Sequence, residues 1–203
     1  MNEQRNRMEL LKSAPVSKAL MDLGLPIMVG MLINALYNLV DAYFVGGLGE
    51  RQMGAISIVF PLGQVVVGLG LMLGNGAASY LSRLLGQGEK EMANRVAATS
   101  LYGSILLGAM VMIPVMILLE PLLRALGATD TIMPYALVYA RIYVVSCLFN
   151  VFNVTMNSLT ASEGSTKTAM CALLSGALLN TVLDPVLIYG LKLGVAGAAI
   201  ATA

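Results

Sequence analysis

Long apolar runs, separated by short stretches of glycine and charged residues, dominate the chain. A helix needs about 20 consecutive apolar residues to cross a bilayer core of about 30 Å. The chain offers enough such runs to predict five complete membrane spans and the start of a sixth. Their expected limits are about residues 18–46, 53–85, 93–125, 132–161, 166–190 and 194–203, the last being incomplete.

Composition favours a membrane protein over a soluble one. Hydrophobic residues make up 58% of the 203 residues and charged residues only 11%, whereas soluble domains carry about a quarter charged residues. We therefore expect an all-α membrane protein, a polytopic helical bundle. Residues 18–203 would form its transmembrane unit and residues 1–17 a cytoplasmic N-terminal segment. The sixth run stops without a polar flank, which we interpret as truncation inside a helix.

Charge and residue types exclude several functions. The net charge is +1, so no basic surface indicates a nucleic-acid partner. The chain has no histidine, which removes His-based metal sites and Ser/His or Cys/His nucleophile pairs. We expect no catalytic residues and no cofactor, and we expect the lipid bilayer as the surrounding medium.

Basic residues in the short loops predict the orientation, because cytoplasmic loops carry an excess of Lys and Arg. One side of the predicted membrane has eight of them and the other has three. The N-terminus would therefore be cytoplasmic. The larger group is Arg5, Arg7, Lys12, Lys18, Arg83, Lys90, Arg95 and Lys167, and the smaller group is Arg51, Arg124 and Lys192.

Two aspartates lie inside predicted spans at matching depth. Asp41 precedes the end of the first span by five residues, and Asp184 precedes the end of the fifth by six. At about 1.5 Å per residue, both lie roughly 7–9 Å below the outer helix ends. Ionisable residues at such depth usually face a bundle interior or a water-filled cavity, and they usually belong to a functional site. We therefore interpret both aspartates as functional.

Amides and phenols accompany the aspartates on the same helix faces. In the first span they follow the i, i+3, i+4, i+7 spacing of one face, and Asn180 lies one turn before Asp184. The fourth span carries a longer polar stripe, for which interhelical packing is the favoured interpretation and a substrate path the alternative. The candidate residues that line a cavity are Asn34, Tyr37, Asn38, Tyr139, Asn150, Asn153 and Asn157.

Proline adds main-chain chemistry to this region. Pro185 has no N–H for the carbonyl of Thr181, so a free carbonyl is expected near Asp184. Carboxylate, amide and carbonyl oxygens suit either Na⁺ or a shared proton, and broken membrane helices often occur where such sites are built. Pro26 and Pro185 are the expected hinge positions.

Three motifs resemble the multidrug and toxic compound extrusion (MATE) family, most closely the branch related to DNA-damage-inducible protein F. They are "NALYNLVDAYFVGGLG", "GLGLMLGNGAASYLSRLLGQGE" and "NTVLDPVLIYGLKLGVAGAAIAT". The resemblance implies a twelve-helix antiporter of two lobes in the cytoplasmic membrane of a prokaryote. It would exchange H⁺ or Na⁺ for bulky cationic or amphipathic compounds.

This chain would be the N-lobe, and its missing partner would be the C-terminal lobe. The resemblance also assigns the ion-coupling site, including a sodium ion if that is the coupling ion, and adds one residue from the sixth helix. The site would consist of Asp41, Asn180, Asp184 and Thr202, with Tyr37, Tyr139 and Asn157 lining the cavity and Pro26 as the bend point.

Two other functions compete with this hypothesis. A lipid-linked oligosaccharide flippase of the same broader fold would need an Arg-rich cavity, and only Arg141 could serve here. An intramembrane aspartyl protease also pairs two membrane aspartates, but it would need a GxGD-type motif where this chain has "VLDP". The choice between H⁺ and Na⁺, and the identity of the exported compound, stay open.

Overall fold

The computed structural model describes residues 16–202, and this part of the chain contains helices and no strand. Residues 1–15, most of the expected N-terminal segment, lie outside the described residues. The elements are α2 (Val16–Gly46), α3 (Glu50–Gln87), α4 (Lys90–Ile117), α5 (Leu119–Ala125), α6 (Met133–Ser162), α7 (Thr166–Pro185), the π-helical turn η1 (Val186–Gly190) and α8 (Val195–Thr202).

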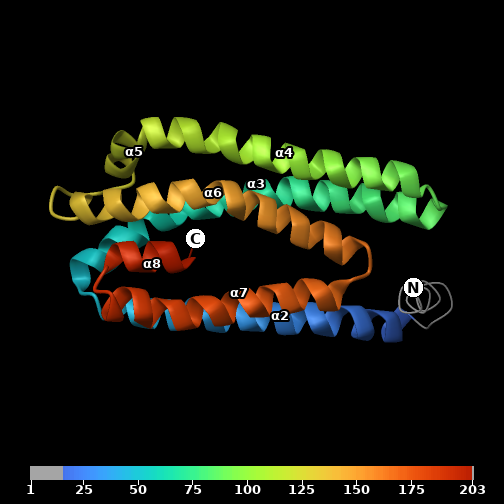
Figure 1. The fold of residues 1–203 in the computed structure, drawn as a ribbon, viewed down its shortest axis with the longest axis horizontal. Helices are drawn as coiled ribbons and strands as arrows, with labels where there is room; N and C mark the ends of the chain where they lie inside the picture. The colour runs from blue at the N-terminus through green and yellow to red at the C-terminus, as the bar shows by residue number, and fades with distance from the viewer. Residues whose placement is uncertain (1–15, 203) are drawn as a thin grey trace.

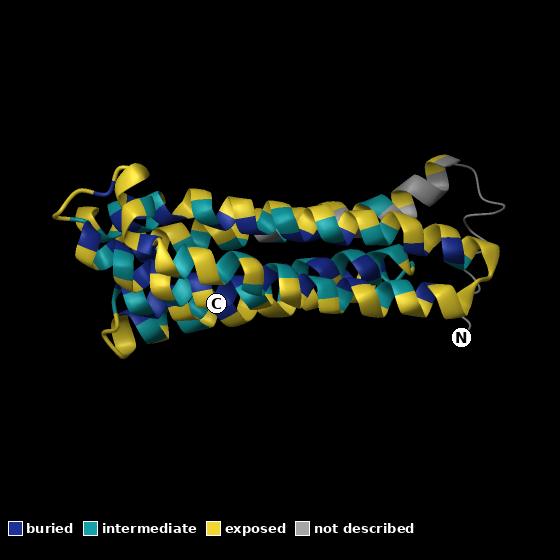
Figure 2. Cartoon of the chain, turned by 90° about the horizontal axis from the view of Figure 1, so that it is seen from above, coloured by how far each residue is buried: buried dark blue, intermediate teal, exposed yellow. Residues whose placement is uncertain are grey.

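Among the described residues, five helical segments are long and apolar enough to cross a membrane. This confirms the prediction of an all-α, polytopic membrane bundle. Exposed residues follow the outer surfaces along the whole length of the bundle (Figure 2). They include large apolar side chains such as Met31, Tyr43 and Ile117. Such surfaces suit lipid, which solvates apolar side chains as well as a protein core does.

The helices form two groups that α8 connects (Figure 1). In one group α3 packs against α6 and α4, and in the other α2 packs against α7. The short helix α8 lies between them and contacts α6, α7 and η1. Elements from both ends of the chain therefore meet around α8.

Glycines bring α3 and α6 close together. A Cβ on Gly70 would lie 3.1 Å from the Val154 side chain, and one on Gly74 would lie 3.1 Å from the Thr155 Cα. Small residues at such spacing let membrane helices approach closely, and van der Waals packing then holds them together. This interface is the most extensive helix pair in the described chain.

The predicted span 93–125 is wrong in one respect, because the helix breaks at Leu118. Pro121 lacks the N–H that would bond the carbonyl of Ile117, and its ring crowds that carbonyl. The chain therefore ends α4 at Ile117 and restarts as α5. Leu119 and Leu123 of α5 are buried in the main core, so α5 packs back onto the end of the bundle.

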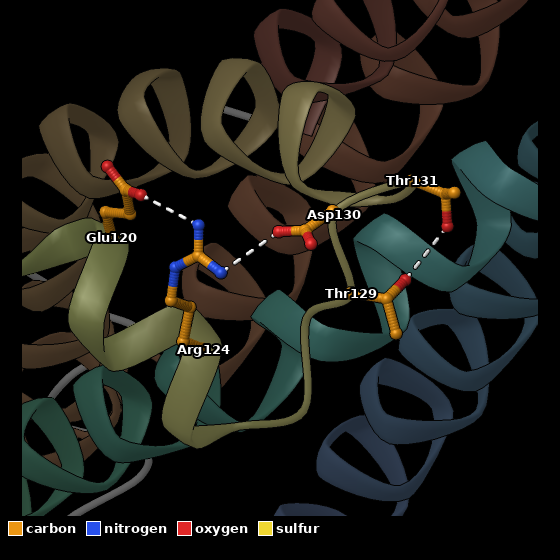
Figure 3. A network of polar contacts seen from close by, with 5 residues as sticks. All are labelled: Glu120, Arg124, Thr129, Asp130 and Thr131. Atoms are coloured by element: carbon orange, nitrogen blue, oxygen red, sulfur yellow. Dashed lines mark hydrogen bonds and ion pairs between the residues drawn. The ribbon is translucent and has the colours of Figure 1, made fainter.

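A polar network holds α5 to the following loop (Figure 3). The Arg124 guanidinium donates to Asp130 Oδ1 at 3.1 Å and to Glu120 Oε1 at 3.2 Å, and the hydroxyls of Thr129 and Thr131 lie 3.0 Å apart. The hydrogen bonds with Asp130 and Glu120 raise the pKa of the Arg124 guanidinium above its ordinary value. Because all of these groups are exposed, the network contributes to the conformation of the loop more than to stability.

The fifth predicted span extends to Gly190, but its last turn is not α-helical. After Pro185 the chain continues as η1, and the Leu191 N–H donates to the Val186 carbonyl at 2.8 Å, a π-type bond. Proline cannot supply its own N–H to the preceding turn, and π-turns inside helices are frequent at functional sites. The wider turn begins at Val186, two residues after Asp184.

The orientation is a first testable prediction. Exposed Arg83, Lys90 and Lys167 lie at one end of the bundle, and exposed Arg51 and Lys192 lie at the other. We expect single cysteines replacing Gln87 and Arg51, in a chain lacking Cys147 and Cys171, to react with an impermeant thiol reagent from opposite sides of the membrane. Gln87→Cys should react from the cytoplasmic side, and labelling of both positions from one side would contradict the topology.

Candidate functional site

The centre of the candidate site is a pair of carboxyl groups held by two adjacent helices. Asp41 of α2 and Asp184 of α7 lie close enough for their carboxyl groups to interact directly. Asp184 is 0% exposed, and Asn180, one helical turn earlier on the same face, is 6% exposed. The packing of α2 against α7 therefore brings together two acids that are far apart in sequence.

Five of the six polar side-chain atoms of these three residues are buried without a hydrogen-bond partner. Within the described residues, no hydrogen-bond partner reaches Asp41 Oδ1, either carboxyl oxygen of Asp184, or either polar atom of the Asn180 amide. Buried polar groups in proteins are almost always hydrogen-bonded, so such a cluster calls for an explanation. It is the signature of a site that binds a small polar species.

The described residues supply no counter-charge to the pair. Their three ion pairs are all exposed and join Glu91 to Arg95 and Arg124 to Glu120 and Asp130. Burying two neighbouring carboxylates without a cation costs far more than burying neutral groups. A proton or a bound cation between the two carboxyl groups would lower this cost.

Phenols and a hydroxyl border the carboxyl pair. The Tyr37 phenol lies beside the Thr202 hydroxyl and near both aspartates, and Tyr139 lies near Thr202 and Asp41. The Thr202 hydroxyl itself donates to the Ala198 carbonyl at 3.0 Å. Helices α2, α6, α7 and α8 therefore converge on this place.

The ligand types fit a hard cation as well as a proton. The described residues contain no cluster of three or more His, Cys, Asp or Glu side chains. Carboxylate, amide and hydroxyl oxygens from Asp41, Asp184, Asn180 and Thr202 are, however, the donors that hard cations take. The arrangement could hold one Na⁺ or one proton, but it offers nothing to a soft metal.

The expected cavity residues do not all behave alike. Asn150 has a buried, unpartnered Oδ1, whereas Asn153 and Asn38 are exposed. The Asn157 amide donates to the Ala169 carbonyl at 3.2 Å and so joins α6 to α7. This bond agrees with the packing interpretation of the α6 stripe at that position. The side chains of Pro26 and Asn34 lie outside the described residues.

Two tyrosines near the site are not among the candidate residues predicted from the sequence. Tyr143 stacks on Tyr139 with ring centroids 5.7 Å apart, and its ring occupies the space that a Cβ on Gly63 would need. The Tyr189 hydroxyl donates to the Phe44 carbonyl at 2.7 Å. Helical spacing already places Tyr143 on the polar stripe of the fourth span with Tyr139, but nothing in the sequence indicated Tyr189.

Known proteins resemble the chain over nearly all of its length. Multidrug export protein MepA of Staphylococcus aureus is 33% identical over 193 residues, which is 95% of this chain and 43% of MepA. An outward-facing multidrug resistance MATE family transporter is 38% identical, with a TM-score of 0.90 over 96% of this chain and 43% of that one. A MATE structure in the bent conformation is also 38% identical, with a TM-score of 0.89 over 97% of this chain and 44% of that one.

The chain thus spans less than half the length of the relatives that it matches. In the matched structures it corresponds to the N-terminal half. These relatives are transporters, which sets aside the protease alternative and agrees with the expectation that the chain is not an enzyme. The MatE family model matches residues 26–186, which is most of the chain and includes both aspartates. The chain belongs to the MatE family of multi-pass membrane transporters.

Proposed function

We propose that this chain is the N-lobe of a multidrug efflux antiporter that exchanges H⁺ or Na⁺ for bulky cationic or amphipathic compounds. The observation that carries the proposal is the pair of half-buried Asp41 and buried Asp184. Three of their four carboxyl oxygens have no hydrogen-bond partner among the described residues, and no described ion pair involves them. The export of drugs by MepA and the MATE relatives supports the choice of substrate class.

The two aspartates would couple the inward movement of H⁺ or Na⁺ to the outward movement of the cationic compound by binding one in exchange for the other. When a proton or Na⁺ occupies the pair, the site loses one of its two negative charges and a cationic compound gains less from it. When the coupling ion leaves, the negative charge attracts the cationic compound and raises its affinity. Because the same carboxylates serve both ligands, the ligands compete, and competition drives antiport.

The neighbouring residues would orient these ligands. Asn180 and Thr202 supply further oxygens to the coupling ion, and the phenols of Tyr37 and Tyr139 offer aromatic faces to a cationic compound. Asn150 and Asn153 stay candidates for the substrate path along α6. Pro26 in α2 stays the candidate bend point, because a proline inside a helix removes one main-chain hydrogen bond.

The remaining partners follow from the same proposal. Alternating access requires two bundles to move against each other, so the chain would act with the C-terminal lobe of its transporter. It would reside in the cytoplasmic membrane of a prokaryote with the N-terminus inside. The flippase alternative is less well supported, because Arg141 is exposed and no other Arg lies in the middle of a described span.

Gradient-driven efflux tests this function. We expect the full-length transporter that carries this chain, reconstituted in liposomes, to move a cationic dye when either a pH gradient or a Na⁺ gradient is imposed alone. The physical reason is that the oxygen cluster must be neutralised by one of these two ions. Efflux with the pH gradient only would assign H⁺, and efflux with the Na⁺ gradient only would assign Na⁺. Dye movement that responds to neither gradient would refute cation coupling.

A further inference from the structure

One contact links the helices that carry the two aspartates, just beyond the carboxyl pair. The Tyr189 hydroxyl of η1 donates to the main-chain carbonyl of Phe44 at the end of α2, at 2.7 Å. The two rings also meet edge to face, with centroids 6.5 Å apart and an interplanar angle of 63°. The hydroxyl and the ring of Tyr189 thus fix η1 to α2.

The place of this contact connects it to the site. Phe44 follows Asp41 by three residues, and Tyr189 follows Asp184 by five. Helices α2 and α7 run side by side, so the contact between Tyr189 and Phe44 joins the two helices about one turn beyond the carboxyl groups. Pro185 and the π-turn interrupt regular α-helical bonding after Asp184, and the Tyr189 contact joins the chain to α2 within this irregular segment.

A glycine makes the contact sterically possible. A Cβ on Gly47 would clash with the Tyr189 hydroxyl and would lie 3.4 Å from the Phe44 carbonyl oxygen. The backbone at Gly47 is not in the left-handed region, so alanine is compatible with its conformation. The absence of a side chain at this position therefore serves the approach of Tyr189. The neighbouring Gly46 has open space around its Cβ position.

We propose that Tyr189 is a positioning residue that holds Asp184 against Asp41 through its hydrogen bond to the Phe44 carbonyl, with Gly47 as the gap that admits its hydroxyl. This role rests on the proposed function of the carboxyl pair as the coupling site. Tyr189 itself does not touch the coupling ion. It sets the separation of the two carboxyl groups and so the affinity of the pair for a cation.

The first test uses efflux by the full-length transporter. Tyr189→Phe removes only the hydroxyl, and Gly47→Ala displaces it sterically. Both variants should raise the concentration of driving cation for half-maximal efflux roughly fivefold, about the effect of one net hydrogen bond. Tyr43→Phe and Gly46→Ala are the matched controls and should behave as the parent protein does.

The second test measures proximity without any transport. In the 203-residue chain with Cys147→Ala, Cys171→Ser, Asp41→Cys and Asp184→Cys, mercuric ion should cross-link the two thiols within the chain. Adding Tyr189→Phe or Gly47→Ala should slow this reaction roughly fivefold, whereas adding Tyr43→Phe or Gly46→Ala should not. An unchanged cross-linking rate in both test variants overturns the positioning role, whatever happens to efflux. Slower cross-linking supports it even if no cation gradient drives efflux, in which case only the proposed coupling fails.

Discussion

Asp184→Asn and Asp41→Asn are each expected to reduce cation-driven dye efflux to the rate of empty liposomes. An amide neither exchanges a proton at these positions nor attracts a cation as a carboxylate does, so the exchange between coupling ion and compound is lost. Insertion and expression should remain near those of the parent protein, because a neutral amide costs less to bury than an unpaired carboxylate. Efflux by the reconstituted full-length transporter, with matched amounts of protein in the membrane, measures the effect.

Glu163→Gln is the matched control for these two variants. It makes the same chemical change at an exposed carboxylate in the turn after α6, far from the pair in the fold. We expect its efflux to equal that of the parent protein. If Asp184→Asn also transported normally, the buried carboxyl at that position would be a packing feature and the coupling proposal would lose its central residue.

Gly197→Ala is expected to lower the free energy of unfolding by about 1–3 kcal/mol, the usual cost of overpacking. A Cβ at this position in α8 would lie 2.8 Å from the carbonyl carbon and oxygen of Leu187 in η1, and main-chain atoms cannot rotate aside. The helix must therefore move away from η1. That movement would also displace Thr202 from Tyr37 and Tyr139, so cation-driven efflux should fall as well.

Thermal unfolding of the 203-residue chain in detergent measures this loss, and Gly176→Ala is its control. Gly176 lies in α7 with nothing within 4 Å of its Cβ position. Alanine there should leave the unfolding temperature unchanged or raise it, because alanine reduces the conformational entropy of the unfolded chain. Equal unfolding temperatures for Gly197→Ala and Gly176→Ala would show that α8 is not packed tightly against η1.

The two kinds of main-chain irregularity show why helix limits were only partly predictable. The prolines themselves are visible in the sequence, so a break near Pro121 and an irregular turn after Pro185 were available as local expectations. Whether the helix breaks or continues as a π-turn at a proline depends on the residues that pack against it in the fold. At Leu118 the apolar residues Leu119 and Leu123 find a core to pack into and the helix restarts. After Pro185 the buried Ile188 lies in the same core, and the helix continues without a break as a wider π-turn.

The sequence by itself determined the number of complete spans, the bundle class and the matched depth of Asp41 and Asp184. The bilayer requires a long apolar helix for every crossing, and such helices are visible in the sequence. It also determined which residues share a helix face, since helical periodicity is local. The tertiary structure alone decided which faces meet: it joined α2 to α7, placed Thr202 beside Tyr37 and Tyr139, turned Asn157 toward the Ala169 carbonyl and brought Tyr189 to Phe44. These contacts join segments far apart in the sequence. In a membrane they depend on the van der Waals fit of whole helix surfaces, and no short stretch of residues encodes that fit.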